Sequence, residues 1–424
     1  GTLDINETST YTGAVTVDNL DIAANKTATF KNNVTLNTSA TINSSATFLV
    51  ASAGTPAAIT VTGSVLGASD GVGTVQITNT GGTTFTTTVG NTANTLALIN
   101  IDQNTTFSGS VEATAINNAA STTATFSDNV TATITNSGTL LFNTSADKSV
   151  TGTIAEAAGG DTTEIKVIDS ADGAPATVTF TATVAADTLT VGTTSKAGAA
   201  LFEDDVTVPA INITGANSGD EDSTVTFNKA VTATSGITLD DNTGVTKVIF
   251  AEANTATITG TINGSATTEG TLQITGATKT FSGAIGGTQA LTLIDIDGTS
   301  IFNAAVSATN IDNDGTATFK SDVTAATAND GTLTLTPNGD NDITHTGAIS
   351  GAGTLNAVEA DDGAVNSVTF STTVAAATFN IGSTSKSGVV ILNGDTTVTN
   401  LNIYAGNVDA EDSTVTVNGD LDTT

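Results

Sequence analysis

The nine residues TATFSDNVT at 123–131 return along the chain with few changes. They stand as TATFKNNVT at 27–35, TVTFNKAVT at 224–232 and TATFKSDVT at 316–324, and more faintly as TVTVNGDLD at 414–422. Successive copies begin 96, 101, 92 and 98 positions apart. Self-similarity at a nearly constant spacing indicates a repeat protein, in which each unit buries its apolar face on its neighbours.

Short apolar runs that alternate with Thr, Ser and Asn fill the rest of the 424 residues. Runs such as ATFLV, INITG and KVIF are each followed within a few residues by Gly, Asn or Asp, which is the pattern of short strands and turns. No apolar period of 3.6 residues extends over ten residues or more. The sequence therefore predicts an ordered, almost entirely β protein, although its net charge is -32 and only 4% of its residues are aromatic.

Phenylalanine marks a finer spacing, with many neighbouring Phe residues 16 to 25 positions apart. About twenty residues accommodate three short strands and three turns, which is one coil of a parallel β-helix. We expect about five such coils in each hundred-residue repeat. Phe, Val, Ile and Leu would then stack inside the tube, with Thr, Ser and Asn outside or at the corners.

Tandem immunoglobulin-like β-sandwiches are the alternative fold, because a sandwich domain also takes about 100 residues. Three features favour the β-helix instead. The chain has no Trp and two Tyr for sandwich cores, its apolar runs are nearer four or five residues than eight, and the repeat length varies between 92 and 101.

A larger repetition indicates an internal duplication. VTFTATVAADTLTVGTTSKAG at 178–198 returns as VTFSTTVAAATFNIGSTSKSG at 368–388, displaced by 190 in the numbering, and the segment at 96–111 returns at 291–306, displaced by 195. Solenoid corners absorb such small insertions without disturbing the stack.

The domain prediction follows from this duplication. We expect one continuous solenoid over 1–424, with duplicated halves at about 45–234 and 235–424, and with residues 1–44 continuing the pattern of the 424 end. The tail STVTVNGDLDTT followed by the head GTLDINETSTYTG indeed parallels the interior stretch at 223–244. The two ends are therefore predicted to be cut points in a longer array or surfaces on which one molecule stacks on the next.

Composition excludes several classes of function. All ten basic residues are Lys, and the net negative charge repels phosphate backbones and anionic lipid headgroups, so we expect no nucleic-acid partner. No apolar run reaches the roughly 18 residues that a membrane-spanning helix needs, so no transmembrane segment is expected. The absence of Cys excludes disulfides and thiolate metal sites.

Longer phrases carry a resemblance to a known family. TITGTINGSATTEGTLQITG at 257–276, HTGAISGAGTL at 345–355 and ALTLIDIDGTSIFNAAVSATNID at 290–312 resemble the passenger region of rickettsial outer membrane protein B and related bacterial β-strand-repeat surface proteins. The shared phrases are G-x-I-x-G-x-G-T-L and T-V-T-F-N-x-x-V. The resemblance covers nearly the whole chain and implies an exported passenger or surface-layer protein. The sequence departs from that family in lacking a C-terminal membrane barrel, which leaves anchoring and export open.

Acidic clusters beside Gly or Asn are the feature most like a binding site. Carboxylates two residues apart in a turn can converge on a hard cation, and Ca²⁺ takes six to eight oxygen ligands. Neither the EF-hand spacing nor a calcium-binding nonapeptide repeat is present, so for any single cluster a solvated turn is the alternative. Calcium is the only cofactor that the sequence suggests, and its candidate ligands are Asp220, Asp222, Asp295, Asp297, Asp312, Asp314, Asp340, Asp342, Asp409, Glu411 and Asp412.

Catalytic residues are not predicted. His345 is the single histidine, and its alternating context DITHTG indicates a surface strand residue rather than a zinc ligand or a triad member. Glycoside hydrolysis by a carboxylate pair is the remaining enzymatic possibility, because sequence does not give the separation of two carboxylates.

We therefore expect a non-enzymatic structural protein at the bacterial cell surface, outside the cell. In this hypothesis it is a rod-like segment of a surface layer, sheath or filament. Its principal partners are copies of itself, packed end to end or side by side. The alternatives are the stalk or passenger of an adhesin, with cell-surface glycans as partners, and a carbohydrate-active β-helix enzyme.

Overall fold

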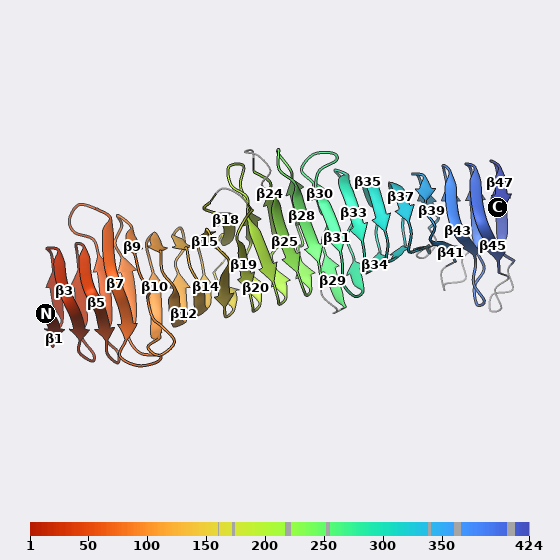
Figure 1. Cartoon of the computed structure of the whole chain (residues 1–424). Coiled ribbons are helices and arrows are strands. Elements are labelled where there is room, and N and C mark those ends of the chain that lie inside the picture. The colour runs from red at the N-terminus through yellow and green to blue at the C-terminus, as the bar shows by residue number, and fades with distance from the viewer. Residues whose placement is uncertain are drawn as a thin grey trace. The chain divides into compact units, whose positions relative to one another are not determined.

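The computed structural model describes residues 1–159, 161–171, 174–216, 222–251, 255–337, 341–359, 366–404 and 412–423 (Figure 1). Every regular element within them is a β-strand, and none of them contains a helix that could cross a membrane. The chain divides into two compact units. The first comprises Gly1–Val208 and Ala216–Glu221, and the second comprises Pro209–Gly215 and Asp222–Thr424.

The strands pair in parallel with the equivalent strands of neighbouring coils, so the fold is a β-solenoid. Coils take about 22 residues on average. Their length in the described residues varies from 16, between Asn313 and Asn329, to 30, between Lys148 and Val178. Immunoglobulin-like sandwiches are excluded, because their sheets are antiparallel. The predicted parallel β-helix is confirmed, with coils slightly longer than expected.

The coils of the first unit have three faces, which we name A, B and C in chain order. Face A contains β2(Ser9–Tyr11), β4(Thr27–Phe30), β6(Thr47–Ala51), β8(Thr74–Thr78), β10(Leu96–Ile101), β17(Ile154–Glu156), β20(Val184–Ala185) and β23(Val206–Thr207). Face B contains β9(Thr83–Phe85), β11(Thr105–Phe107), β13(Thr123–Phe126), β15(Thr139–Thr144), β18(Glu164–Asp169) and β21(Thr188–Val191). Face C contains β1(Thr2–Ile5), β16(Lys148–Thr151), β19(Thr177–Phe180) and β22(Ala199–Phe202). Longer strands bend around a corner, from B to C in β3(Val15–Ile22), β5(Val34–Ile42) and β7(Ile59–Gly67), and from C to A in β12(Val111–Asn118) and β14(Val130–Asn136).

The second unit has the same plan, with faces named D, E and F in chain order. Face D contains β25(Ser223–Phe227), β28(Thr246–Phe250), β31(Thr271–Ile274), β33(Leu291–Ile296), β40(Ile349–Ser350) and β47(Leu421–Thr423). Face E contains β26(Val231–Thr232), β29(Ala256–Thr259), β32(Lys279–Phe281), β34(Thr299–Phe302), β36(Thr316–Phe319), β38(Thr332–Leu335) and β41(Thr354–Ala357). Face F contains β24(Ala210–Thr214), β27(Gly236–Asp240), β30(Ile262–Gly264), β39(Ile343–His345), β42(Ser367–Phe370), β44(Val389–Leu392) and β46(Thr414–Val417). Here β35(Val306–Asn313) and β37(Val323–Asn329) bend from F to D, and β43(Val374–Ile381) and β45(Thr396–Ile403) bend from D to E.

The alternating sequence decides which side chains enter the core. In β13, for example, Ala124 and Phe126 are fully buried while Thr123 and Thr125 point outward and are half-buried. Because side chains alternate across a strand, every coil contributes its apolar set to the same interior. β-branched Thr suits the exposed face of a strand, since it keeps strand propensity where a polar group meets solvent.

Phenylalanine rings stack directly on one another along single faces of the solenoid. On face B, Phe85, Phe107, Phe126 and Phe142 follow one another with ring centroids 5.3, 5.3 and 5.6 Å apart and interplanar angles of 8°, 7° and 22°. The stack then leaves face B, because Phe142 meets Phe180 of face C edge to face at 88°. The second unit repeats this change of face between Phe250 and Phe281, at 83°.

The hundred-residue repeat explains why the stacks change face. In the first unit Ala28 aligns through successive coils with Phe48, Val75, Ile99 and Ile116, which is four steps on face A. The next copy of the phrase then begins one face further on, in β13 of face B.

The second unit shows the same advance. Its three copies of the phrase lie in β25 of face D, β36 of face E and β46 of face F. The expectation of five coils in each repeat is therefore wrong. Each repeat spans four coils and one additional face.

Candidate functional site: an acidic ladder and inter-coil staples

Two predicted acidic clusters lie on consecutive coils of face D. Asp295 in β33 aligns with Gln273 on one side and with Asp312 of β35 on the other. The Gln273 amide donates to Asp295 at 2.9 Å and to Asp297 at 3.3 Å. The repeated sequences Asp-Ile-Asp-Gly and Asp-Asn-Asp-Gly thus place their carboxylates in register.

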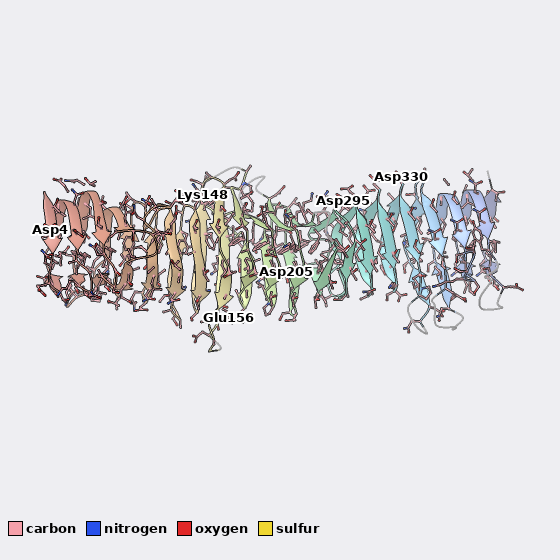
Figure 2. All side chains as sticks on the ribbon, turned by 90° about the horizontal axis from the view of Figure 1, so that it is seen from below. Asp4, Lys148, Glu156, Asp205, Asp295 and Asp330 are labelled. Carbon is pink, nitrogen blue, oxygen red and sulfur yellow. The ribbon has the colours of Figure 1, made fainter. Side chains whose placement is uncertain are left out.

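The turn that follows these strands adds a second row of carboxylates. The same turn position is occupied by Asp297, Asp314 and Asp330. Their backbone N–H groups donate at 2.9 to 3.0 Å to carbonyl oxygens of the preceding coil, those of Ile274, Ile296 and Asn313 respectively. The adjoining glycines are required by close backbone approach. A Cβ at Gly315 would lie 2.0 Å from the carbonyl oxygen of Gly298. We name Asp295, Asp297, Asp312, Asp314 and Asp330 the acidic ladder, and Figure 2 labels Asp295 and Asp330 on the same margin of the second unit.

Electrostatics within the ladder favour the protonated forms of Asp295 and Asp312. Burial raises the pKa of Asp295 above its ordinary value of 3.8, and the neighbouring charge of Asp297 raises it further. Burial likewise raises the pKa of Asp312, followed by the charges of Asp314 and Asp330. Like charges in close register disfavour ionisation, so the ladder is a concentration of negative potential that attracts cations.

This concentration of charge does not by itself make a metal centre. Within the residues that the structure describes, no three Asp, Glu, His or Cys side chains are grouped closely enough to hold a metal ion. Ca²⁺ binding at Asp295, Asp297, Asp312 and Asp314 stays a prediction.

Other candidate ligands bind backbone rather than facing one another. Asp222 accepts a hydrogen bond from the backbone N–H of Val245 at 2.8 Å, one coil further along the chain. Asp342 accepts from the N–H of Ser367 at 2.7 Å in the same way. We name such a contact an inter-coil staple. It satisfies a strand-end donor that would cost about 1–3 kcal/mol if it were buried without a partner.

Some candidates are not brought into any cluster. The backbone carbonyl of Asp412 accepts a hydrogen bond from the Thr414 hydroxyl at 3.4 Å. Four candidates lie outside the described residues, namely Asp220, Asp340, Asp409 and Glu411.

The staples have a sequence signal that was missed. The seventh residue of the repeated phrase is Asn33, Asn129 or Asp322 in three of its copies. In each case the side chain accepts a backbone N–H of the next coil, from Thr60 at 2.9 Å, from Ser149 at 2.8 Å and from Thr344 at 2.8 Å. The signal is a polar residue directly before a buried Val, namely Val34, Val130 and Val323.

A pair of carboxyl groups lies in the first unit. Burial and the nearby charge and hydrogen bond of Asp187 raise the pKa of Glu156. The buried Thr163 lies between them, with its backbone N–H donating to Asp187 at 2.9 Å. The hydroxyl of Thr163 lies 3.5 Å from Glu156 and 3.3 Å from Asp187, so it occupies the space between the two carboxyl groups that a sugar or a water needs in a glycosidase. This arrangement suits a structural contact.

The expectation for His345 is wrong, because its side chain is buried, with 1% exposed. It occupies the position in face F that Val323 holds in one adjacent coil and Phe370 in the other. Its Nδ1–H donates to the carbonyl oxygen of Gly347 at 2.9 Å, and its Nε2 accepts from the Thr327 hydroxyl at 3.1 Å. An alternating strand places every second residue inside, and His345 lies on the inward phase with Ile343.

Comparisons with protein-family models, with curated proteins and with solved structures found no match for this chain.

Proposed function

We propose that this protein is a non-enzymatic structural protein of the bacterial cell surface, a solenoid that assembles with copies of itself outside the cell. The observation that carries the proposal is the use of its polar side chains. Asp222, Asp322 and Asp342 hold one coil to the next through backbone hydrogen bonds. Such residues contribute to a stack of coils, and the chemistry of a substrate does not require them.

Apolar exposure in the last coil supports association through stacked coils. Ile403 is 52% exposed and Val417 is 39% exposed, although both occupy positions that other coils bury. Among the described residues, β46 pairs only with β44 and β47 only with β45. Strand edges with free hydrogen-bonding groups are templates for pairing with another chain.

The register of this association follows from the repeat. The interior segments β25, β26 and β27 occupy faces D, E and F in turn. The equivalent tail strands β46 and β47 occupy faces F and D, so β1 of a second copy takes face E and completes the coil. Apolar surface would be buried as the coils meet, and backbone hydrogen bonds would form along both edges.

Sedimentation velocity and electron microscopy of the 424-residue chain test the proposal, with and without added Ca²⁺. We expect filaments or sheets that grow with protein concentration and are blocked by Val417→Asp. Val245 provides the matched control, because it is 48% exposed but lies in a turn between β27 and β28. Assembly that tolerates Val417→Asp, or that Val245→Asp abolishes equally, rules out the proposed joint. A chain that stays monomeric at all concentrations contradicts self-assembly.

A further inference from the structure

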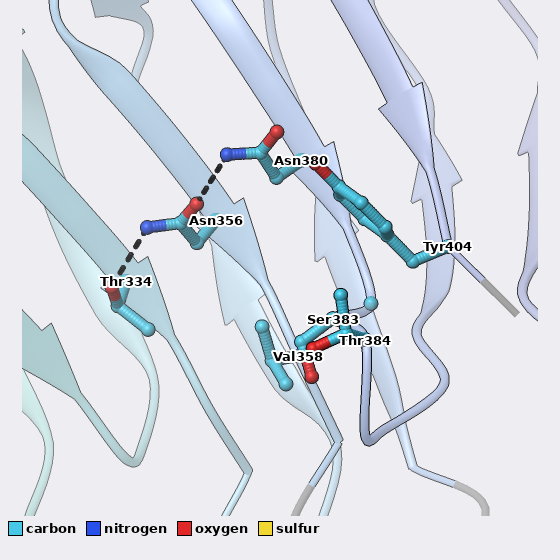
Figure 3. A pocket seen from close by; sticks show the side chains of 8 residues that line it. Thr334, Asn356, Val358, Asn380, Ser383, Thr384 and Tyr404 are labelled. Atoms are coloured by element: carbon cyan, nitrogen blue, oxygen red, sulfur yellow. Dashed lines mark hydrogen bonds between the residues drawn. The ribbon is translucent and has the colours of Figure 1, made fainter. Parts of the chain in front are cut away.

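A groove of about 390 Å³ is lined by residues from four consecutive coils at face E of the second unit (Figure 3). Its floor is a row of outward polar side chains, Thr334, Asn356 and Asn380. Asn356 donates to the Thr334 hydroxyl at 3.2 Å, and Asn380 donates to the Asn356 carbonyl oxygen at 2.8 Å. Asn402 on the following coil donates to Asn380 at 2.9 Å. We name this row the amide ladder.

The walls of the groove come from one aromatic ring and one turn. The half-buried Tyr404 lies by the Asn380 end of the amide ladder, and Ser383, Thr384 and Val358 lie along the same side of the ladder (Figure 3). The turn is held by internal hydrogen bonds, because Ser383 N–H donates to Lys386 O at 2.6 Å and Lys386 N–H donates to the Ser383 hydroxyl at 3.1 Å. This wall of the groove is therefore fixed without a ligand.

The amide ladder offers both donors and acceptors to a ligand. A primary amide has two N–H donors and an oxygen with two lone pairs. Asn356 and Asn380 each use one N–H donor and one oxygen lone pair within the row. Each therefore retains one N–H donor and one lone pair for a ligand. Coils lie about 4.8 Å apart, so this pair of groups recurs at that interval along the axis of the unit.

The chemistry of the lining favours a neutral ligand rich in hydroxyl groups. The described lining residues are Thr, Asn, Val, Gly, Ser and Tyr, and none of these carries a charge at neutral pH. The net charge of -32 disfavours anions. A hydroxyl both donates and accepts, which matches the amide ladder, and the apolar face of a sugar ring packs on an aromatic side chain.

The duplicated sequence offers an internal comparison. The turn at 193–196 in the first unit has the same hydrogen bonds as the turn at 383–386, with Thr193 N–H donating to Lys196 O at 2.7 Å. The residues that correspond to Asn356, Asn380 and Tyr404 at a displacement of 190 are Lys166, Thr190 and Thr214.

The first unit therefore builds the same turn over a charged floor. Lys166 forms an ion pair with Glu164 at 2.9 Å, and the Thr190 hydroxyl donates to Glu164 at 3.2 Å. The amide ladder with its aromatic wall is a property of the second unit's copy.

We propose that this groove binds a neutral saccharide chain laid along the axis of the second unit, with about one sugar residue to each coil. Extended β-1,4-linked chains fit best, since each residue advances by about one coil spacing. The amide ladder would bind the ring hydroxyl groups, and Tyr404 would cover one sugar face. An extended neutral peptide is disfavoured, because its backbone groups would have to cross the strands rather than pair with a strand edge. This inference does not depend on self-assembly.

Tyrosine fluorescence provides a direct assay, because the chain contains no Trp and only two Tyr. In a Tyr11→Phe background Tyr404 is the single emitter. The probes are cellotriose and N,N′,N″-triacetylchitotriose, with the anionic trigalacturonate and the blocked peptide acetyl-tetraalanine-amide as comparisons. We expect saturable binding of a neutral trisaccharide with a roughly millimolar dissociation constant.

Titration calorimetry on variants tests the site itself. Tyr404→Ala should weaken binding about tenfold and Tyr404→Phe should retain it, because stacking needs only the ring. Thr214→Ala, at the corresponding position of the first unit, should leave binding unchanged. The inference is overturned if neither neutral trisaccharide binds, if Tyr404→Ala binds as tightly as the unaltered chain, or if trigalacturonate or the peptide binds more tightly.

Discussion

Acid should weaken the second unit around His345, and the structure gives the size of the effect. Burial is the main cause that lowers the pKa of His345, from 6.5 to about 4, against the opposing hydrogen bond to Gly347. The native state therefore favours the neutral ring, while the unfolded chain protonates near 6.5. The contribution of the neutral His345 to stability is therefore fully present above pH 6.5, and it is lost as the pH falls from 6.5 toward 4. At 1.36 kcal/mol for each pKa unit, the loss is about 3 kcal/mol.

His345→Phe isolates this contribution from the titrating carboxylates. Phe suits a position that is flanked by Val323 and Phe370, and the ring centroids of His345 and Phe370 are 6.3 Å apart. The substitution leaves Thr327 without its imidazole partner, so the variant should be less stable than the unaltered chain at pH 7 by about 1–3 kcal/mol. Between pH 7 and pH 4 its relative stability should improve by about 3 kcal/mol.

Hydrogen exchange of single amides is the appropriate assay, because a stack of coils does not have to unfold in one step. The amides of Thr346 and Ser371 report on this region, since they donate to Val323 and His345. An amide of β13 in the first unit serves as the control and should respond to pH equally in both proteins. If the free-energy difference between the two proteins is the same at pH 7 and pH 4, the buried neutral histidine does not titrate as described.

Three further predictions test the packing and the acidic ladder. Gly315→Ala should destabilise the chain by about 3 kcal/mol, since its Cβ would meet a backbone oxygen at 2.0 Å, whereas Gly13→Ala, with no atom within 4 Å of its Cβ, should be almost neutral in urea unfolding. Phe107→Ala should lower the free energy of unfolding by about 3–5 kcal/mol, because Phe107 is fully buried between two stacked rings. The outward Thr106→Ala should lower it by less than about 0.5 kcal/mol, so equal unfolding midpoints for the two variants would contradict the stacked core. Asp312→Asn should raise the melting temperature at pH 7 and have little effect below pH 3.8, because a raised native pKa means that stability falls as the pH rises; a variant that melts lower at pH 7 would show that the carboxylate is favourably paired.

The fold could be predicted from the sequence because its determinants are local and repeated. The alternation in TATF, with buried Ala124 and Phe126, requires only the two-residue period of a strand. The coil length could not be fixed as well. Short coils, such as the one from Asn313 to Asn329, coexist with long ones, such as the one from Lys148 to Val178, since turns of any length leave the paired strands in register.

Long-range geometry limited the prediction of the candidate site. The sequence identified Asp295 and Asp312 but not that they lie on adjacent coils of one face, since this depends on the exact length of the coil that joins them. It also did not separate carboxylates that bind backbone, such as Asp342, from those that face one another. His345 was misplaced because its polar character outweighed its phase in the strand.

The advance of the repeated phrase by one face has a consequence for how such a chain can lengthen. If the gene gained one hundred-residue repeat inside the second unit, the coils beyond the insertion would still stack, but every outward residue on them would turn by a third of a revolution relative to the coils before it. If the insertion fell between the acidic ladder on face D and the amide ladder on face E, the angle between the directions in which the two ladders face would change. Only the insertion of three repeats, or of a multiple of three, would leave the two ladders facing the same directions relative to each other. The number of repeats in this architecture therefore sets the orientation of surface features as well as the length.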